Sequence, residues 1–179
     1  VFISGTGSNL KNLINFSKTK KSPISIDLII SNTIKAKGLK YSNQYKIKKK
    51  ILNFKNIRIA EKRLLNLLKQ NKIQFICLAG FMKILSSKFI KQFNGKIINI
   101  HPSLLPRYKG LNTHSRAIQN KDKFTGCSVH YVTEQLDSGK IILQKKIKIL
   151  KKDTPKSLAE KVLKQEHKLY PKAILKIFN

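Results

Sequence analysis

Cysteine is scarce in this sequence, which holds only Cys77 and Cys127 among 179 residues. Two thiols without metal-type spacing argue against a disulfide framework and against a cysteine-based metal site. They suit a reducing compartment, so we expect a cytoplasmic location. Cys127 follows Gly126 in an expected strand, and we expect its thiol to lie in the core.

Long apolar runs are also missing, although 41% of the residues are hydrophobic. No stretch is long enough to span a bilayer and no signal peptide opens the chain, so we expect no membrane partner. The apolar content excludes a disordered chain, and the length suits one domain with a real core. Val1 already lies in an expected strand, so we expect that the sequence lacks its natural start.

Acidic residues number 8 against 38 basic ones, which gives a formal charge of +30. Such a charge suits phosphate partners, and a non-enzymatic nucleic-acid binder is therefore one alternative reading. Arginine, however, accounts for only four of the basic residues, and the lysines are scattered rather than clustered. Lysine, isoleucine and asparagine are abundant together, as in proteins of AT-rich genomes. Because nucleic-acid readers favour arginine and interleaved aromatics, we expect no nucleic-acid partner.

Several catalytic signatures are absent. There is no G-x-S-x-G nucleophile elbow, which argues against a serine hydrolase. His101, His114, His130 and His167 lack the spacing of a zinc site, so we expect no metal. His130 alternates with apolar neighbours in an expected strand, and we interpret it as a structural residue.

Strands and helices alternate along the chain, as judged from hydrophobic periodicity. Strands are expected at residues 1–4, 24–30, 46–52, 73–79, 96–100, 124–133 and 139–150, and helices at 10–18, 36–45, 58–70, 86–93, 112–120 and 155–178. This order predicts an α/β fold with a mostly parallel sheet, whose last two strands can pair antiparallel. No linker or repeat divides the chain, so we expect one domain over residues 1–179.

The first glycine loop, GTGSN at residues 5–9, lies between a strand and a helix. Glycines allow close approach of an anion, and a helix N-terminus offers unpaired N–H groups. The dinucleotide-binding pattern is incomplete because position 10 is leucine, and no Walker lysine follows. The loop is either a site for one phosphate on a small substrate or a tight turn in which Ser8 caps the helix.

Asn99 and His101 lie two residues apart at the end of an expected strand, so their side chains share one face. Pro102 restrains the backbone of His101. An amide and a protonated imidazole are donors suited to a developing oxyanion. Asp137, one of the few acids, would raise the imidazole pKa and fix its orientation if it lay nearby. The sequence alone does not establish that contact.

Four segments together resemble phosphoribosylglycinamide formyltransferases, the folate-dependent enzymes of purine synthesis: ISGTGSN, LAGFMKILS, NIHPSLLPRYKGLNTH and SVHYVTEQLDSGKIILQ. They occur in the family's order over essentially the whole chain. SLLP with an upstream N-x-H is typical of the wider group of 10-formyltetrahydrofolate transferases. The resemblance implies a Rossmann-like, three-layer formyltransferase fold.

The resemblance also implies site residues. Asn99, His101 and Asp137 match the catalytic trio. Gly5, Thr6, Gly7, Ser8 and Asn9 match the substrate-phosphate loop, and Glu166 resembles a glutamate near the ribose. The folate-binding set matches Arg58, Met82, Lys83, Ile84, Leu85, Asn99, Glu134, Leu136 and Asp137. Two positions depart from the family pattern. Many relatives have histidine at the position of Asn112, and the family often has arginine at the position of Lys83.

The implied reaction transfers the formyl group of 10-formyltetrahydrofolate to the amine of glycinamide ribonucleotide, with neither a metal nor a covalent enzyme intermediate. The implied partners are these two small molecules, and the chain is expected to be a monomer or a homodimer. Activity like that of methionyl-tRNA formyltransferase or of formyltetrahydrofolate deformylase is the alternative. Those families carry an additional domain for which this chain leaves no residues.

Overall fold

The structure is a computed structural model that describes all of residues 1–179. It divides into two compact units, Val1–Ile98 and Asn99–Asn179. The division falls within strand β5 (Lys96–His101). The expectation of one domain over residues 1–179 stays a prediction.

The first unit alternates strands and helices in the predicted order. Its elements are β1 (Phe2–Ile3), α1 (Ser8–Ser17), β2 (Leu28–Ser31), the short 3-10 helix η1 (Lys37–Leu39), α2 (Lys40–Tyr45), β3 (Lys48–Ile51), α3 (Ile57–Gln70), β4 (Phe75–Leu78), α4 (Ser87–Gln92) and the start of β5. Ser86 caps α4 as predicted, because its hydroxyl accepts a hydrogen bond from the Phe89 N–H.

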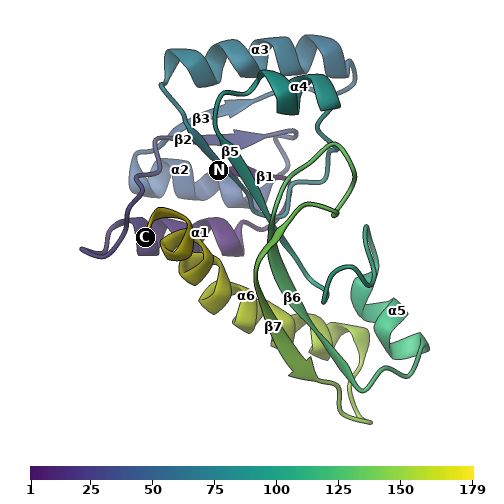
Figure 1. Cartoon of the computed structure of the whole chain (residues 1–179). Coiled ribbons are helices and arrows are strands. Elements are labelled where there is room, and N and C mark those ends of the chain that lie inside the picture. Colours follow the sequence, from purple (N-terminus) through teal and green to yellow (C-terminus); the bar gives the residue numbers. More distant parts are fainter. The chain divides into compact units, whose positions relative to one another are not determined.

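The strands of the first unit pair in parallel. Phe2 of β1 lies opposite Ile30 of β2 on one side and Leu78 of β4 on the other, and β2 pairs with β3. Helices α1 and α2 lie on one side of these strands, and α3 and α4 lie together on the other (Figure 1). Because helices cover both faces, β2 is buried along its whole length.

Strand β2 is shorter than the predicted 24–30 segment. The Ser22 hydroxyl donates to the Ile24 carbonyl, and the Ser25 hydroxyl donates to the Asp27 carboxylate. These local side-chain bonds compete with sheet pairing before Leu28.

The second unit contains the end of β5, α5 (Thr113–Gln119), β6 (Phe124–Tyr131), β7 (Ile141–Lys148) and α6 (Pro155–Phe178). Strands β6 and β7 pair antiparallel, with an irregularity between Val129 and His130. Helix α6 packs against both strands and against α5 (Figure 1). Its start is fixed by a capping box between Thr154 and Ser157.

The hydrogen-bonded strand order is β3-β2-β1-β4-β5-β6-β7, a seven-stranded sheet that is mostly parallel and ends in antiparallel strands. This confirms the predicted fold class. No helix combines the length and the apolar character that crossing a membrane requires.

Candidate active site

The ends of β5 and β6 and the loop after β6 bring four polar side chains of the second unit together. His101 Nδ1 lies 3.4 Å from Asp137 Oδ2, and His130 Nε2 lies 3.6 Å from Asp137 Oδ1. Asn99 Nδ2 lies 3.3 Å from His130 Nε2. We call Asn99, His101, His130 and Asp137 the strand-end cluster. Because three of its members are at most 9% exposed, their charges are poorly screened by water.

The orientation of His101 is set by a backbone carbonyl. His101 Nε2 lies 2.8 Å from the Tyr108 oxygen, and because a carbonyl only accepts, Nε2 carries a proton and donates. Nδ1 then faces Asp137. Proton uptake at Nδ1 would give both ring nitrogens an acceptor, so this geometry suits an imidazolium.

Burial opposes that charge. Desolvation lowers the pKa of His101 below its ordinary value, although the hydrogen bond to the Tyr108 carbonyl and the charge of Asp137 both raise it. The charge of Asp137 by itself raises the pKa of this imidazole, as predicted. The prediction is wrong for the net shift of the pKa, which is downward. In the protein without substrate, His101 is therefore neutral at neutral pH.

The pKa of Asp137 is lowered. Burial is its largest single influence and raises it, but hydrogen bonds from His130 and from the Gly110 N–H, with the charges of His101 and His130, outweigh burial. The Gly110 N–H donates to Asp137 Oδ2 over 2.8 Å. Asp137 has a φ of 46°, in the left-handed region that aspartate tolerates better than most residues. It stays ionised and holds the loop after Tyr108 beside the histidines.

His130 is the member of the cluster that the sequence analysis missed. Its Nδ1–H donates to the Tyr131 carbonyl over 2.8 Å. Its Nε2 faces both the Asn99 amide nitrogen, at 3.3 Å, and Asp137 Oδ1, at 3.6 Å. The amide nitrogen of Asn99 therefore points into the cluster, and its second N–H can serve a ligand. No local pattern links residues 99 and 130, because their contact depends on neighbouring strands β5 and β6.

The SLLP segment after the cluster is anchored by a buried serine. The Ser128 hydroxyl on β6 donates to the Ser103 carbonyl over 2.6 Å and accepts from the Leu105 N–H over 3.1 Å. Gln144 of β7 donates both to Ser128 and to the Leu105 carbonyl. A Cβ on Gly126 would lie 2.0 Å from the Lys145 carbonyl of β7 and 2.7 Å from the Leu104 side chain, so only glycine fits between them. The anchored segment leads directly to the Tyr108 carbonyl that orients His101.

The glycine loop lies in the first unit, at the N-terminus of α1. Gly7, with a φ of 75°, is the residue before the helix, and no side chain caps it. The alternative that Ser8 caps the helix is therefore wrong, because Ser8 is the first helical residue. A Cβ on Gly7 would lie 2.5 Å from the Gly38 Cα, so only glycine fits. The uncapped first-turn N–H groups suit an anion.

The segment Met82–Leu85 of the first unit is fixed at both ends. The Met82 N–H donates to the Ser4 hydroxyl over 2.7 Å, and the Ser86 N–H donates to Glu61 Oε1 over 2.7 Å. Between these anchors Met82 and Ile84 are 60% and 64% exposed, whereas Leu85 is buried. Two apolar side chains held outward on a fixed backbone offer a surface for an apolar ligand.

The other predicted residues divide between the units. Arg58 is exposed in the first turn of α3, and Lys83 is exposed between Met82 and Ile84. In the second unit, Glu134 and Leu136 are exposed in the loop before Asp137. Glu166 is buried on α6.

Two other sequence features have local explanations. Asn112 has a φ of 58°, in the left-handed region that asparagine adopts more readily than most residues. Cys127 is a fully buried free thiol, as predicted, and burial raises its pKa to about 12.

Nowhere do three or more His, Cys, Asp or Glu side chains come together as a metal ion would require. The absence of a metal from the reaction stays a prediction.

A mixed α/β sheet whose strand end carries an amide, imidazoles and a carboxylate defines an enzyme of the acyl-transfer class. Residues 1–174 match the formyl transferase family, and the chain belongs to that family. This confirms the resemblance seen in the sequence.

Named relatives support the same family. The chain is 40% identical over 177 residues to phosphoribosylglycinamide formyltransferase of Haemophilus influenzae, covering 97% of this chain and 84% of the relative. It is 42% identical to the human trifunctional purine biosynthetic protein adenosine-3, again over 97% of this chain, but spans only 18% of that protein.

Solved structures agree with this relation. A phosphoribosylglycinamide formyltransferase from Bacillus halodurans superimposes with a TM-score of 0.94 at 34% identity, covering 99% of this chain and 93% of that one. The enzyme from Brucella melitensis gives a TM-score of 0.92 at 41% identity, covering 98% and 92%.

Proposed function

We propose that this protein transfers the formyl group of 10-formyltetrahydrofolate to the amine of glycinamide ribonucleotide. The products are formylglycinamide ribonucleotide and tetrahydrofolate, and the reaction belongs to purine synthesis. The observation that carries the proposal is the strand-end cluster, in which His101 lies 3.4 Å from Asp137 and Asn99 lies 3.3 Å from His130. The named relatives supply the substrate identity.

The donor presents a formyl carbon that the substrate amine attacks, and negative charge then develops on the formyl oxygen. The Asn99 amide, oriented by His130, donates to this oxygen. His101 is neutral before the reaction, and the charge developing beside it, together with Asp137, raises its pKa. A proton taken up from solvent at Nδ1, and returned to solvent when the intermediate collapses, makes His101 a second donor to the oxygen, while Asp137 at 3.4 Å stabilises the imidazolium. The amine gives up its proton to the departing folate nitrogen through water held by Asp137.

The first unit contributes binding groups in this proposal. The loop Gly5–Asn9 holds the substrate phosphate on the uncapped N–H groups of α1, since an anion is favoured at the positive end of a helix. Met82 and Ile84 provide apolar contacts for the folate ring, with Lys83 and Leu85 in the same segment. Arg58 supplies a cation for the folate carboxylates.

The second unit contributes the remaining contacts. Glu134, Leu136 and Asp137 belong to the loop proposed to hold the pterin, and Leu136 is 50% exposed there. Glu166 is proposed to contact the ribose. We keep the prediction of a monomer or a homodimer that acts on small molecules.

A turnover assay with three acceptors tests the proposal. The protein receives 10-formyltetrahydrofolate with glycinamide ribonucleotide, with initiator methionyl-tRNA, or with water alone. We expect tetrahydrofolate to form rapidly only with glycinamide ribonucleotide. Formylated tRNA as the main product would assign the first alternative activity, and free formate as the main product would assign the deformylase.

A further inference from the structure

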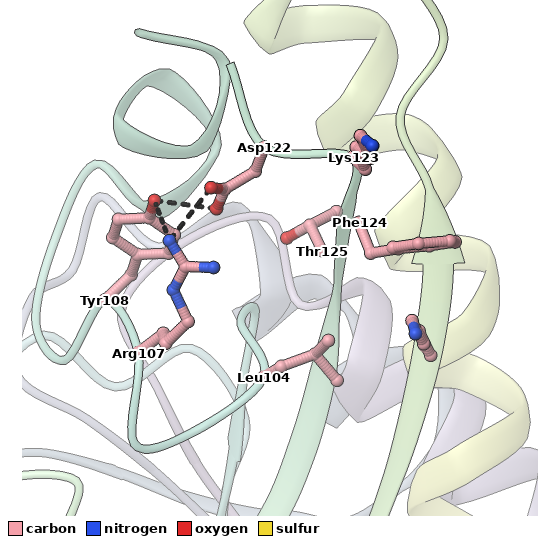
Figure 2. Close-up of a pocket in the computed structure, with 8 residues that line it drawn as sticks. Leu104, Arg107, Tyr108, Asp122, Lys123, Phe124 and Thr125 are labelled. Carbon is pink, nitrogen blue, oxygen red and sulfur yellow. Dashed lines mark hydrogen bonds and ion pairs between the residues drawn. The ribbon is translucent and has the colours of Figure 1, made fainter. Parts of the chain in front are cut away.

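A cavity of the second unit lies at the start of β6, whereas His130 of the strand-end cluster lies near the end of that strand. It has a volume of about 300 Å³, at the small end of ligand sites. Its walls come from the loop after SLLP, the turn into β6 and the facing part of β7 (Figure 2). It is lined by Leu104, Arg107, Tyr108, Asp122, Lys123, Phe124, Thr125 and Lys146.

This cavity differs from the proposed active site, although Tyr108 lines it and also accepts a hydrogen bond from His101 through its backbone carbonyl. Thr125 lines the cavity at the start of β6, and His130 belongs to the strand-end cluster near the end of the same strand. Five residues of extended strand place the two side chains roughly 17 Å apart. A ligand of about 300 Å³ in the cavity would therefore not reach the cluster.

The cavity contains a hydrogen-bonding group with no partner. Thr125 is 3% exposed, and its Oγ1 makes no hydrogen bond. Figure 2 shows this oxygen turned toward the side of the cavity where Arg107 and Tyr108 lie. Because an unpaired buried hydroxyl destabilises the folded protein, an occupant that bonds to it is favoured.

The charged groups around the cavity are mostly positive. Lys123, Lys146 and Arg107 lie on its wall, and the Lys146 ammonium lies 3.9 Å from the centre of the Phe124 ring. The one acid, Asp122, is already occupied. It accepts from the Arg107 guanidinium over 2.8 Å and from the Tyr108 hydroxyl over 2.7 Å.

Lysine is common everywhere on this chain, so the cations alone carry no inference. The combination of a cavity, a buried unpartnered hydroxyl and apolar walls from Leu104 and Phe124 is what distinguishes this place.

We propose that this cavity binds a small organic anion with a flat apolar body. Leu104 and Phe124 contact the body, the cations hold a carboxylate or a phosphate, and the Thr125 hydroxyl donates to the same ligand. The inference does not depend on the formyl-transfer reaction.

A titration followed by amide NMR of the full chain tests the inference. The probes are phenyl phosphate, benzoate and the neutral benzamide. We expect saturable shifts at the Thr125 and Phe124 amides with at least one of the two anions and none with benzamide. Whichever anion binds more tightly identifies the acidic group. Equal binding of benzamide, or no shift at these amides with either anion, would overturn the proposal.

Two variants and a matched control make the test specific. Thr125→Val keeps the shape and removes the hydroxyl, so affinity should fall about fivefold, the equivalent of one ordinary hydrogen bond. Lys146→Gln should weaken the anion similarly, whereas Lys151→Gln, the same charge change at an exposed turn, should leave binding unchanged. If Lys151→Gln lowered the affinity as much as Lys146→Gln, the effect would come from the overall charge of the chain and the proposal would be wrong.

Discussion

At the residue scale, His101 is held between two opposing influences. Its ring nitrogens face the Tyr108 carbonyl and Asp137, an arrangement that suits a charged imidazole. Burial nevertheless lowers its pKa below the ordinary value. A residue in this position is neutral at rest and gains a proton when negative charge appears next to it, which is what an oxyanion donor requires.

Replacing the carboxylate tests this balance. In Asp137→Asn, the pKa of His101 should fall further, because the charge that raises it is removed. Histidine NMR titration of the folded protein measures the change directly. Asp27→Asn, at an exposed carboxylate that bonds to Ser25, is the matched control and should leave His101 unaffected. An unchanged His101 titration in Asp137→Asn would show that the pairing has no electrostatic consequence.

His130 shows why part of the site was not predictable. Asn99 and His101 share a strand face by alternation alone, so their proximity follows from the sequence. His130 reaches Asn99 only because β6 lies beside β5, and Tyr108 acts through its backbone carbonyl. Residue identity predicts neither contact, since the first depends on strand neighbours and the second on loop conformation.

At the element scale, the SLLP segment acts as an anchored support for the site. Ser128 connects the segment to β6, and Gln144 connects it to β7. The SLLP segment therefore has a structural role, because it positions the Tyr108 carbonyl against His101.

Removing this anchor should destabilise the second unit. Ser128→Ala leaves the Leu105 N–H and the Ser103 carbonyl without their partner in a buried place, so the free energy of unfolding should fall by about 1–3 kcal/mol. Denaturant unfolding measures the loss. Ser25→Ala, at an exposed serine, should change the free energy of unfolding by less than about 0.5 kcal/mol. Equal effects of the two substitutions would remove the proposed role of Ser128.

Local side-chain hydrogen bonds explain where helix α6 begins and why strand β2 is short. Helix α6 covers the predicted residues 155–178, since Pro155 and the Thr154 cap fix its start. Strand β2 is shorter than predicted because Ser22 and Ser25 bond locally. The sequence left open whether a side chain caps the helix after the glycine loop. The close approach of Gly7 to Gly38 decides this, and the two segments lie some thirty residues apart in the chain.

At the scale of the whole molecule, charge and buried histidines together set the response to acid. The chain carries a formal charge of +30 before any histidine is protonated. Burial lowers the pKa of His101, His114 and His167. Each added proton therefore brings charge into a buried place and adds to the repulsion of an already positive chain.

Stability should consequently fall as the solution becomes acidic. The unfolded chain has histidine pKa values near 6.5 and binds more protons than the folded one below that pH. The melting temperature should decline from about pH 6.5 downward, through the lowered folded pKa values of these histidines. Differential scanning calorimetry across this range measures it. High salt screens the repulsion between charges but does not change the desolvation of the histidines. Part of the decline in melting temperature should therefore persist at high salt. A melting temperature independent of pH between about 7.5 and 5 would contradict the lowered pKa values.

The central claim is that the strand-end cluster carries formyl transfer to glycinamide ribonucleotide, and its most direct test is single-turnover kinetics of Asn99→Ala and His101→Ala. Loss of one oxyanion donor should slow transfer about 10²–10³-fold in variants whose unfolding curves show that they are still folded. Asn94→Ala, at an exposed asparagine, should keep full activity. If either cluster variant were folded and transferred formyl at nearly the wild-type rate, the assignment of the active site would be wrong.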